Sequence, residues 1–239
     1  MIVAAAFCPH PPLLVPMLAR GAAGDLAGVR AASIEAIQRA ARASGGSARL
    51  LVLGSAPASM IHSPLARGTF APLGADVEVG LGSPSRGGAL ELSLSLSVGA
   101  WLVGAALGPR SGAMGLSVGP GFAASQAAAD LPGLLDAGDW ALVVMGDGSA
   151  RPRGRSPGAP DAPAPAPLDD TVARALSDGD CGALAALDSS AAARLLCAGA
   201  PAWIAAGGLL AGACWEATLG YAGAPYGVAY FVASWRRAG

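Results

Sequence analysis

The sequence predicts an α/β fold with a mostly parallel central sheet and helices on both faces. Continuous apolar runs without polar alternation are typical of strands buried on both faces, and they occur at 2–7 and 49–54. Between them, apolar residues recur from Leu26 to Ile37 at the spacing of one helix face. A strand, a helix and a second strand in this order predict a right-handed crossover that joins a parallel pair.

The other elements follow from the same patterns along the chain. The first helix is expected over 26–42 and is ended by the glycine pair at 45–46. Alternation at 76–81 predicts an edge strand, and a helix is expected to begin near Ser93 or Ser95. The remaining expected elements are buried strands at 113–119 and 140–148 with an Ala-rich helix between them, helices from Asp169 or Asp170 to about Ser177, at 181–187, at 190–198 and at 201–214, and a final strand at 226–235.

The composition indicates one folded globular domain over residues 1–239. Apolar residues make up 53% of the chain and charged residues 13%, which is far from the profile of a disordered chain. A low-complexity loop of Pro, Ala and Arg is expected at 151–167. The 15 basic residues, all arginine, are balanced by 16 acidic ones to a net charge of −1, so no cationic surface for nucleic acid is implied.

Cysteine usage and the charge pattern favour a cytoplasmic protein. The chain has four cysteines without the spacing of a metal or redox motif, namely Cys8, Cys181, Cys197 and Cys214. We expect them to be small buried residues in a reducing compartment. No basic region precedes the N-terminal apolar run, which argues against a signal peptide. The uncharged stretches at 92–109 and 195–215 are rich in Ala, Gly and Ser, so we expect buried helices there rather than membrane spans.

The carboxyl ends of the expected strands define the candidate site, because ligands of open parallel sheets bind there. His10, Ser55 and the segment 146–150 follow three of these strands. His10 stands between prolines and can ligate a metal or move a proton near neutral pH. We expect Ser55 to bond a local backbone amide and Asp147 to bond the amides of its own turn. His62 is expected to be a surface residue of a loop.

Four segments of the chain resemble the landmark segments of a known enzyme family. They are CPHPPLLVP at 8–16, LVLGSAP at 51–57, VVMGDGSARP at 143–152 and APYGVAYFVASW at 224–235. The family is the class III extradiol ring-cleavage dioxygenases, and the most similar branch contains uncharacterised bacterial relatives of the catalytic B subunit of protocatechuate 4,5-dioxygenase. The resemblance implies oxidoreductase ancestry and a sheet of the B-subunit type. Active members hold a non-haem Fe(II) with two histidines and a carboxylate, which leaves positions open for catechol and dioxygen.

This chain departs from the family's ligand pattern at most positions. His10 matches the first histidine ligand, but the second falls on Ser55 and the acid/base histidine falls on Ala150. The carboxylate position falls on Gly223, with Glu216 close enough in sequence to be an alternative. Because a metal ion needs several donors that converge at ~2.0–2.2 Å, the resemblance implies a degraded iron site. We expect no bound cofactor and no ring cleavage.

Three functions stay open, and the first is a non-catalytic family member with a retained binding crevice. It would bind a small aromatic molecule or a protein partner between Pro11, Ala150 and Tyr226. A homodimer is also expected, because an apolar helix such as 201–214 needs cover. Neither nucleic acid nor a membrane is an expected partner.

The other two functions are catalytic. In an active dioxygenase, Fe(II) would be held by His10, His62 and Glu216, which requires those three side chains to converge. In a hydrolase, Ser55 would be the nucleophile and His10 its base, because the resemblance places both at one former ion site. Asp147 would then be the acid that orients the imidazole.

Overall fold

The computed structural model describes residues 1–45, 49–82, 89–108, 112–122, 138–150 and 167–239, and its centre is a seven-stranded sheet of order β3-β6-β2-β7-β1-β9-β8. The strands are β1 (Ile2–Cys8), β2 (Leu50–Ser55), β3 (Met60–His62), β6 (Met114–Val118), β7 (Trp140–Met145), β8 (Trp215–Gly223) and β9 (Tyr230–Arg237). The central strands β6, β2, β7 and β1 are parallel, whereas β3 and β9 run antiparallel to their neighbours. The predicted α/β class is therefore confirmed.

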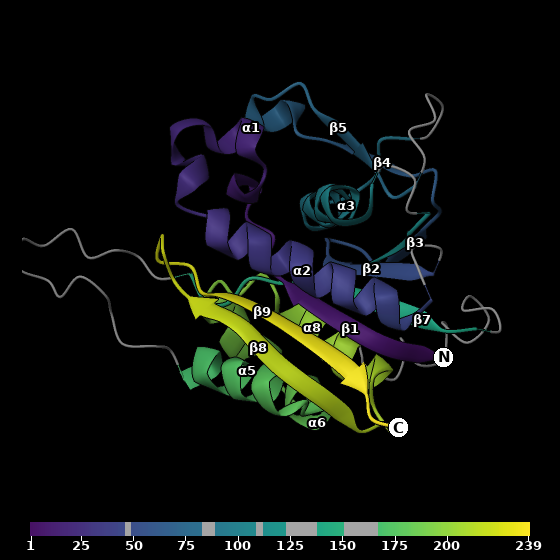
Figure 1. Ribbon diagram of the computed structural model, residues 1–239. Coiled ribbons are helices and arrows are strands. Elements are labelled where there is room, and N and C mark those ends of the chain that lie inside the picture. The colour runs from purple at the N-terminus through teal and green to yellow at the C-terminus, as the bar shows by residue number, and fades with distance from the viewer. Residues whose placement is uncertain (46–48, 83–88, 109–111, 123–137, 151–166) are drawn as a thin grey trace, which may run out of the picture.

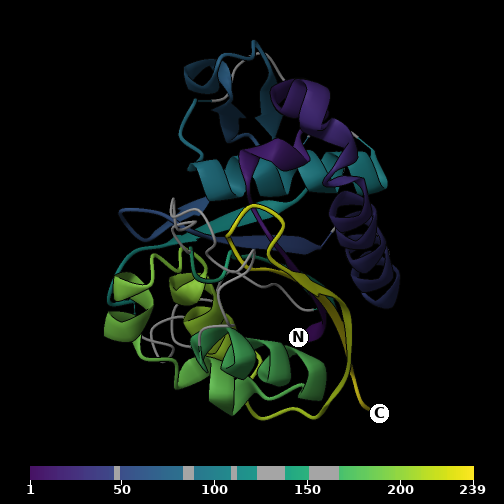
Figure 2. The same cartoon turned by 90° about the vertical axis from the view of Figure 1, so that its left-hand side faces the viewer.

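Helices cover both faces of this sheet (Figure 1). One face carries α2 (Ala27–Ala43) and α3 (Leu94–Leu107), and the other carries α5 (Pro167–Asp178), α6 (Cys181–Ala185), α7 (Ser189–Arg194) and α8 (Ala200–Leu209). Figure 2 shows a small sheet of β4 (Arg67–Thr69) and β5 (Glu78–Gly80) beyond α3, next to the short α1 (Pro16–Ala19). Three 3-10 turns complete the described elements: η1 (Pro12–Leu14), η2 (Arg20–Gly24) and η3 (Ala71–Leu73).

The central strands are apolar throughout because both of their faces are covered. Every position of β7 is buried. Its side chains alternate, so that Val143 and Met145 pack in the core under α2 and α3, while Leu142 and Val144 pack in the core under α5 to α8. This is the reason why the continuous apolar runs in the sequence identified β1, β2, β6 and β7.

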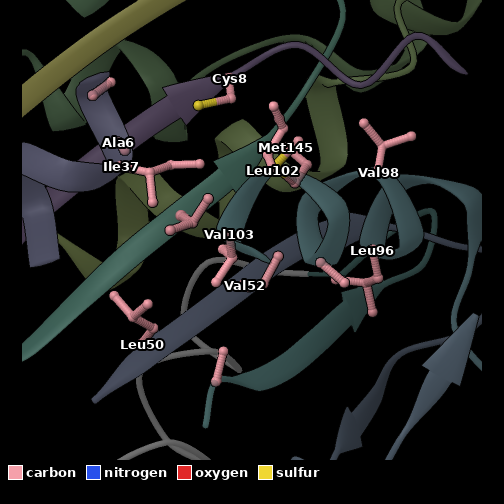
Figure 3. Packing of buried hydrophobic residues seen from close by; sticks show 14 of the residues in the cluster. Ala6, Cys8, Ile37, Leu50, Val52, Leu96, Val98, Leu102, Val103 and Met145 are labelled. Carbon is pink, nitrogen blue, oxygen red and sulfur yellow. The ribbon is translucent and has the colours of Figure 1, made fainter. Parts of the chain in front are cut away.

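The contact between α3 and the sheet depends on Gly99. A Cβ at this position would lie 2.7 Å from Cγ1 of Val52 and 3.0 Å from Cγ of Met145. Figure 3 shows Val52 and Met145 in the layer of apolar side chains beneath this helix. The helix begins at Leu94, and the Ser93 side chain caps it by accepting the Leu96 N–H, which confirms the predicted start.

The predicted pairing of the first two strands is wrong. β1 and β2 are parallel, but β7 lies between them, with Met145 level with both Cys8 and Gly54. The connection through α2 therefore skips one strand position in the sheet, and β7 occupies this position. The order of strands depends on these long-range pairs, which local periodicity does not report.

Several boundaries also differ from expectation. Strands β3, β4 and β8 were not predicted, and β5 belongs to the small separate sheet instead of an edge of the main one. The final strand begins at Tyr230, since Tyr226 belongs to the turn before it and Val228 forms only an isolated bridge. Helix α5 begins at Pro167, which places Asp169 and Asp170 in its first turn. The Ala-rich helix expected before 140 and residues 151–166 of the expected loop lie outside the described residues.

Burial corrects two further expectations. Cys8 and Cys197 are buried as predicted, but Cys181 is partly exposed and Cys214 is exposed. Most of α8 is buried against the chain's own core, so this helix gives no reason to expect a homodimer, which stays a prediction without that support. In the part of the chain that the structure describes, no helix has both the length and the apolar character needed to cross a bilayer.

Candidate functional site

His10 and Asp147 form a buried pair at the carboxyl edge of the sheet. Each follows its strand by two residues, and β1 and β7 are adjacent with Cys8 opposite Met145. The backbone N–H of His10 donates to Oδ1 of Asp147 at 2.7 Å, and Nε2 of His10 lies 3.8 Å from Oδ2. Both residues are 8% exposed. The register of two parallel strands thus brings together a histidine and a carboxylate.

The surroundings of Asp147 disfavour its negative charge. Burial raises the pKa of this carboxyl, while the nearby His10 charge and the His10 N–H act in the opposite direction. Gly199 packs so closely that an added Cβ would lie 2.7 Å from the Asp147 nitrogen. Tyr230 lies close enough for the Asp147 charge to add to the burial that raises the pKa of its phenol. Nδ1 of His10 is buried and has no hydrogen-bond partner among the described residues.

Asp147 does not have the role expected for it in its own turn. Its carboxylate binds the backbone of His10 instead, and the neighbouring turn is held by Asp169. Oδ1 of Asp169 accepts the Ser149 N–H at 2.9 Å, and Oδ2 accepts the Ser149 hydroxyl at 2.5 Å. Sequence reasoning assigned Asp169 only to a helix cap. An acidic residue in the first turn of α5 was the available signal, but its partner 20 residues earlier was not visible.

Ser55 does not pair with His10. It ends β2, which β7 separates from β1, and its hydroxyl donates to the carbonyl of Ala198 at 2.7 Å. Among the described residues the hydroxyl accepts no bond from a local amide, and its partner is a distant carbonyl oxygen. The hydroxyl therefore tethers the end of β2 to the segment before α8.

Ala150 lies where the hairpin of β8 and β9 reaches the carboxyl edge. It forms an isolated bridge with Val228, and its N–H donates to the Leu195 carbonyl at 3.0 Å. The hairpin is fixed again by Tyr226, whose hydroxyl donates to Oδ2 of Asp25 at 2.7 Å. Pro11 is buried on the other side of His10 and precedes η1. Tyr226 thus lies in a turn, not on the final strand.

His62 and Glu216 lie far from His10. His62 is level with Gly115, Val52, Val143 and Ala6 on successive strands, so four strand spacings of ~4.8 Å separate its backbone from β1 by ~19 Å. Glu216 pairs with Arg236, which is opposite Ala4 at the start of β1. His10 lies six residues further along, about 20 Å away at ~3.3 Å per residue. The three side chains of the alternative iron site therefore do not converge.

His62 is buried, not a surface residue. It is 2% exposed, with Nε2 3.2 Å from the Ser117 hydroxyl oxygen and Nδ1 3.5 Å from Oε1 of Glu91. This row of serine, histidine and glutamate is not accessible for chemistry, because Ser117 is itself 2% exposed and its hydroxyl lies within bonding distance of two backbone carbonyls. It joins β3 to β6 and to the segment before α3.

The comparisons with known proteins do not define a family. The chain matches no protein-family model and no curated protein. A solved structure of an uncharacterized protein from Escherichia coli K12 is similar, with a TM-score of 0.48 and 12% identity over 98% of this chain and 99% of that chain. A similarity of that size defines neither function nor family.

Proposed function

We propose that this protein is a non-catalytic member of the class III extradiol dioxygenase family, with the B-subunit type of fold, and that it binds a small molecule. The observation that carries the proposal is the placement of the histidines. The chain has two: His10 follows β1 and His62 ends β3, and these two strands lie about 19 Å apart across the sheet. A ferrous site with two histidines and one carboxylate cannot be assembled from them.

The residues at the carboxyl edge do not fit ferrous iron. His10 and Asp147 supply one imidazole and one carboxylate, and the position of the second histidine holds Ser55, whose hydroxyl is bound to Ala198. Ala150 has no side-chain donor. Among the residues that the structure describes, no group of three His, Cys, Asp or Glu side chains is placed to hold a metal ion. We therefore derive no oxygen chemistry for this site.

The hydrolase alternative lacks its central contact. A serine nucleophile needs a hydrogen bond to its base, and the Ser55 hydroxyl donates elsewhere. In the part of the chain that the structure describes, the Nδ1 atom of His10 has no hydrogen-bond partner, and Nε2 faces Asp147. This arrangement supports binding more than catalysis.

Anaerobic reconstitution with Fe(II), followed by metal analysis, tests the proposal. We expect the natural chain to retain no stoichiometric iron and to consume no oxygen with catechol. The double variant Ser55→His with Ala150→His restores both missing imidazoles and should gain iron, because two donors of the edge are already in place. Adding His10→Ala to that variant is the control and should remove the gain. One ferrous ion per natural chain, together with ring cleavage, would overturn the proposal.

A further inference from the structure

A pocket of about 470 Å³ lies at the carboxyl end of β6, on the α5 to α8 side of the sheet. Its volume is within the range of small-molecule sites. Its walls come from the segment after β6 and from helices α7 and α8. The pocket thus lies at the carboxyl edge of the parallel strands. Ligands of open α/β sheets bind at this edge.

The wall after β6 is a preformed turn. Pro120 and Gly121 are its central residues, Gly121 has a φ of 79°, and the Phe122 N–H donates to the Gly119 carbonyl at 3.2 Å. Proline followed by a glycine with positive φ is the signature of a type II turn. The Ser59 hydroxyl oxygen accepts the Gly119 N–H at 3.0 Å and fixes the turn to the segment before β3. Phe122 is therefore held at the pocket before a ligand binds, so binding does not have to order a flexible loop.

The floor and walls of the pocket are apolar and carry no charge. Leu187, Ala192 and Cys197 are buried at its base, and Phe122 and Ile204 are partly buried at its sides. None of the described residues that line the pocket is Asp, Glu, Arg or His. Burial raises the pKa of the Cys197 thiol to about 12, so this group is neutral as well. A charged ligand group would lose its hydration here without gaining a counter-charge.

The mouth of the pocket supplies a small number of polar groups. Ser189 and Ser190 are exposed at the start of α7, and no hydrogen bond of their hydroxyls occurs among the described residues. They can therefore bond a hydroxyl, carbonyl or amide of a ligand. Cys197 connects the base of the pocket to the backbone near His10, because its thiol donates to the Asp147 carbonyl at 3.4 Å.

We infer that this pocket binds a small, uncharged, mostly apolar molecule with one or two hydrogen-bonding groups. The inference rests on the proposed binding function and adds its location and the chemistry of its ligand. The site is separate from the His10 and Asp147 side chains, and its lining residue Cys197 contacts the backbone of Asp147. The lining chemistry selects against anions and cations.

Titration with three matched naphthalene probes tests the inference. 1-Naphthol is neutral, 1-naphthoate is anionic and 1-naphthylmethylammonium is cationic. Amide chemical shifts of the labelled chain report where each probe binds. We expect 1-naphthol to bind at least about ten-fold more tightly than either ion and to shift Cys197, Phe122 and Ile204, because desolvation penalises the charged probes. Equal binding of the three probes would overturn the inference.

A pair of variants separates this pocket from other sites. Ala193 lines the mouth and is exposed on α7, so Ala193→Trp fills the entrance without changing the core. Ala31 is exposed on α2, on the opposite face of the sheet, and Ala31→Trp is the matched control. We expect Ala193→Trp to weaken the binding of 1-naphthol about ten-fold and Ala31→Trp to leave its affinity unchanged.

Two outcomes would refute the inference that this pocket is the ligand site without contradicting the proposed function. In the first, 1-naphthol binds but shifts the residues around His10 and is insensitive to Ala193→Trp. In the second, the natural chain is a dimer that Ala193→Trp dissociates, so that a second copy fills the pocket. Failure of the proposed function is seen separately, as stoichiometric iron and ring cleavage in the reconstitution experiment.

Discussion

Replacing Asp147 by asparagine tests the electrostatics of its pair with His10. The carboxylate is 8% exposed, and burial raises its pKa above the ordinary value of 3.8 despite the opposing His10 charge and N–H. Asparagine keeps an oxygen that can accept the His10 N–H, which lies 2.7 Å away in the natural chain, but it carries no charge. The substitution therefore removes the buried charge and preserves the hydrogen bond.

The sign of the effect follows from the direction of the pKa shift. Because the pKa is raised in the folded state, the protonated carboxyl favours folding, and this stability is fully present below pH 3.8. It is lost as the pH rises through the raised pKa. Each pH unit between the unfolded and folded values removes ~1.4 kcal/mol of unfolding free energy. The asparagine variant lacks this loss, so it should gain stability relative to the natural chain as the pH rises.

Urea unfolding at intervals from about pH 4 to about pH 8 measures this difference. Asp147→Ala is the control, because it removes the acceptor and leaves the buried His10 N–H unpaired, which should make it ~1–3 kcal/mol less stable than the asparagine variant at every pH. The reasoning would be refuted if the free energy of unfolding of the natural chain rose relative to that of the asparagine variant as the pH increased. The attraction between His10 and the carboxylate would then exceed the cost of burial.

Two further predictions concern packing and thiol reactivity. Gly99→Ala should lower the free energy of unfolding by ~1–3 kcal/mol, because its Cβ would lie 2.7 Å from Val52. The control Gly104→Ala lies in the same helix, meets no atom within 4 Å and should raise the free energy of unfolding by ~0.4–1 kcal/mol. Urea unfolding measures both variants, and equal effects would contradict the close approach of the helix to Val52. A disulfide reagent at mildly alkaline pH should label the exposed Cys214 rapidly and leave Cys8 unlabelled, because burial raises the pKa of the Cys8 thiol to about 12. The denatured chain is the control, and rapid labelling of Cys8 in the folded chain would contradict its burial.

The elements that the sequence predicted well are those whose local residue pattern directly reflects their burial in the fold. The runs at 2–7, 49–54 and 140–148 are buried on both faces, so their composition alone identified β1, β2 and β7. The start of α3 was predictable because the Ser93 cap is a local contact. These features need no information about distant segments.

Strand β8 was missed because its environment differs along its two faces. Its residues alternate between partly buried and exposed, but Gly220 and Ala222 on the exposed face are not polar, so the sequence lacks a regular alternation of apolar and polar residues. The position of β7 between β1 and β2 was missed for another reason. It depends on pairing between segments far apart in the chain, which leaves no periodic trace.

For the site, the sequence predicted the edge of the sheet but not the contacts. Ser55 ends β2, and His10 and Asp147 follow β1 and β7, so all three lie at the carboxyl edge that these parallel strands share. Which of them touch depends on strand order, because the inserted β7 brings Asp147 to His10 and separates Ser55 from it. The burial of His62 depends likewise on β3, a three-residue strand that has too few positions for a periodic pattern.

The place of β1 between β7 and β9 has a consequence for how the chain folds (Figure 1). Both neighbours of this apolar strand are made long after it, and His10 and Asp147 are 137 positions apart. During synthesis, β1 must therefore keep both of its edges unpaired while more than half of the chain is added. We expect slow closure of the sheet, with the pairing of β1 and β9 among the last contacts to form.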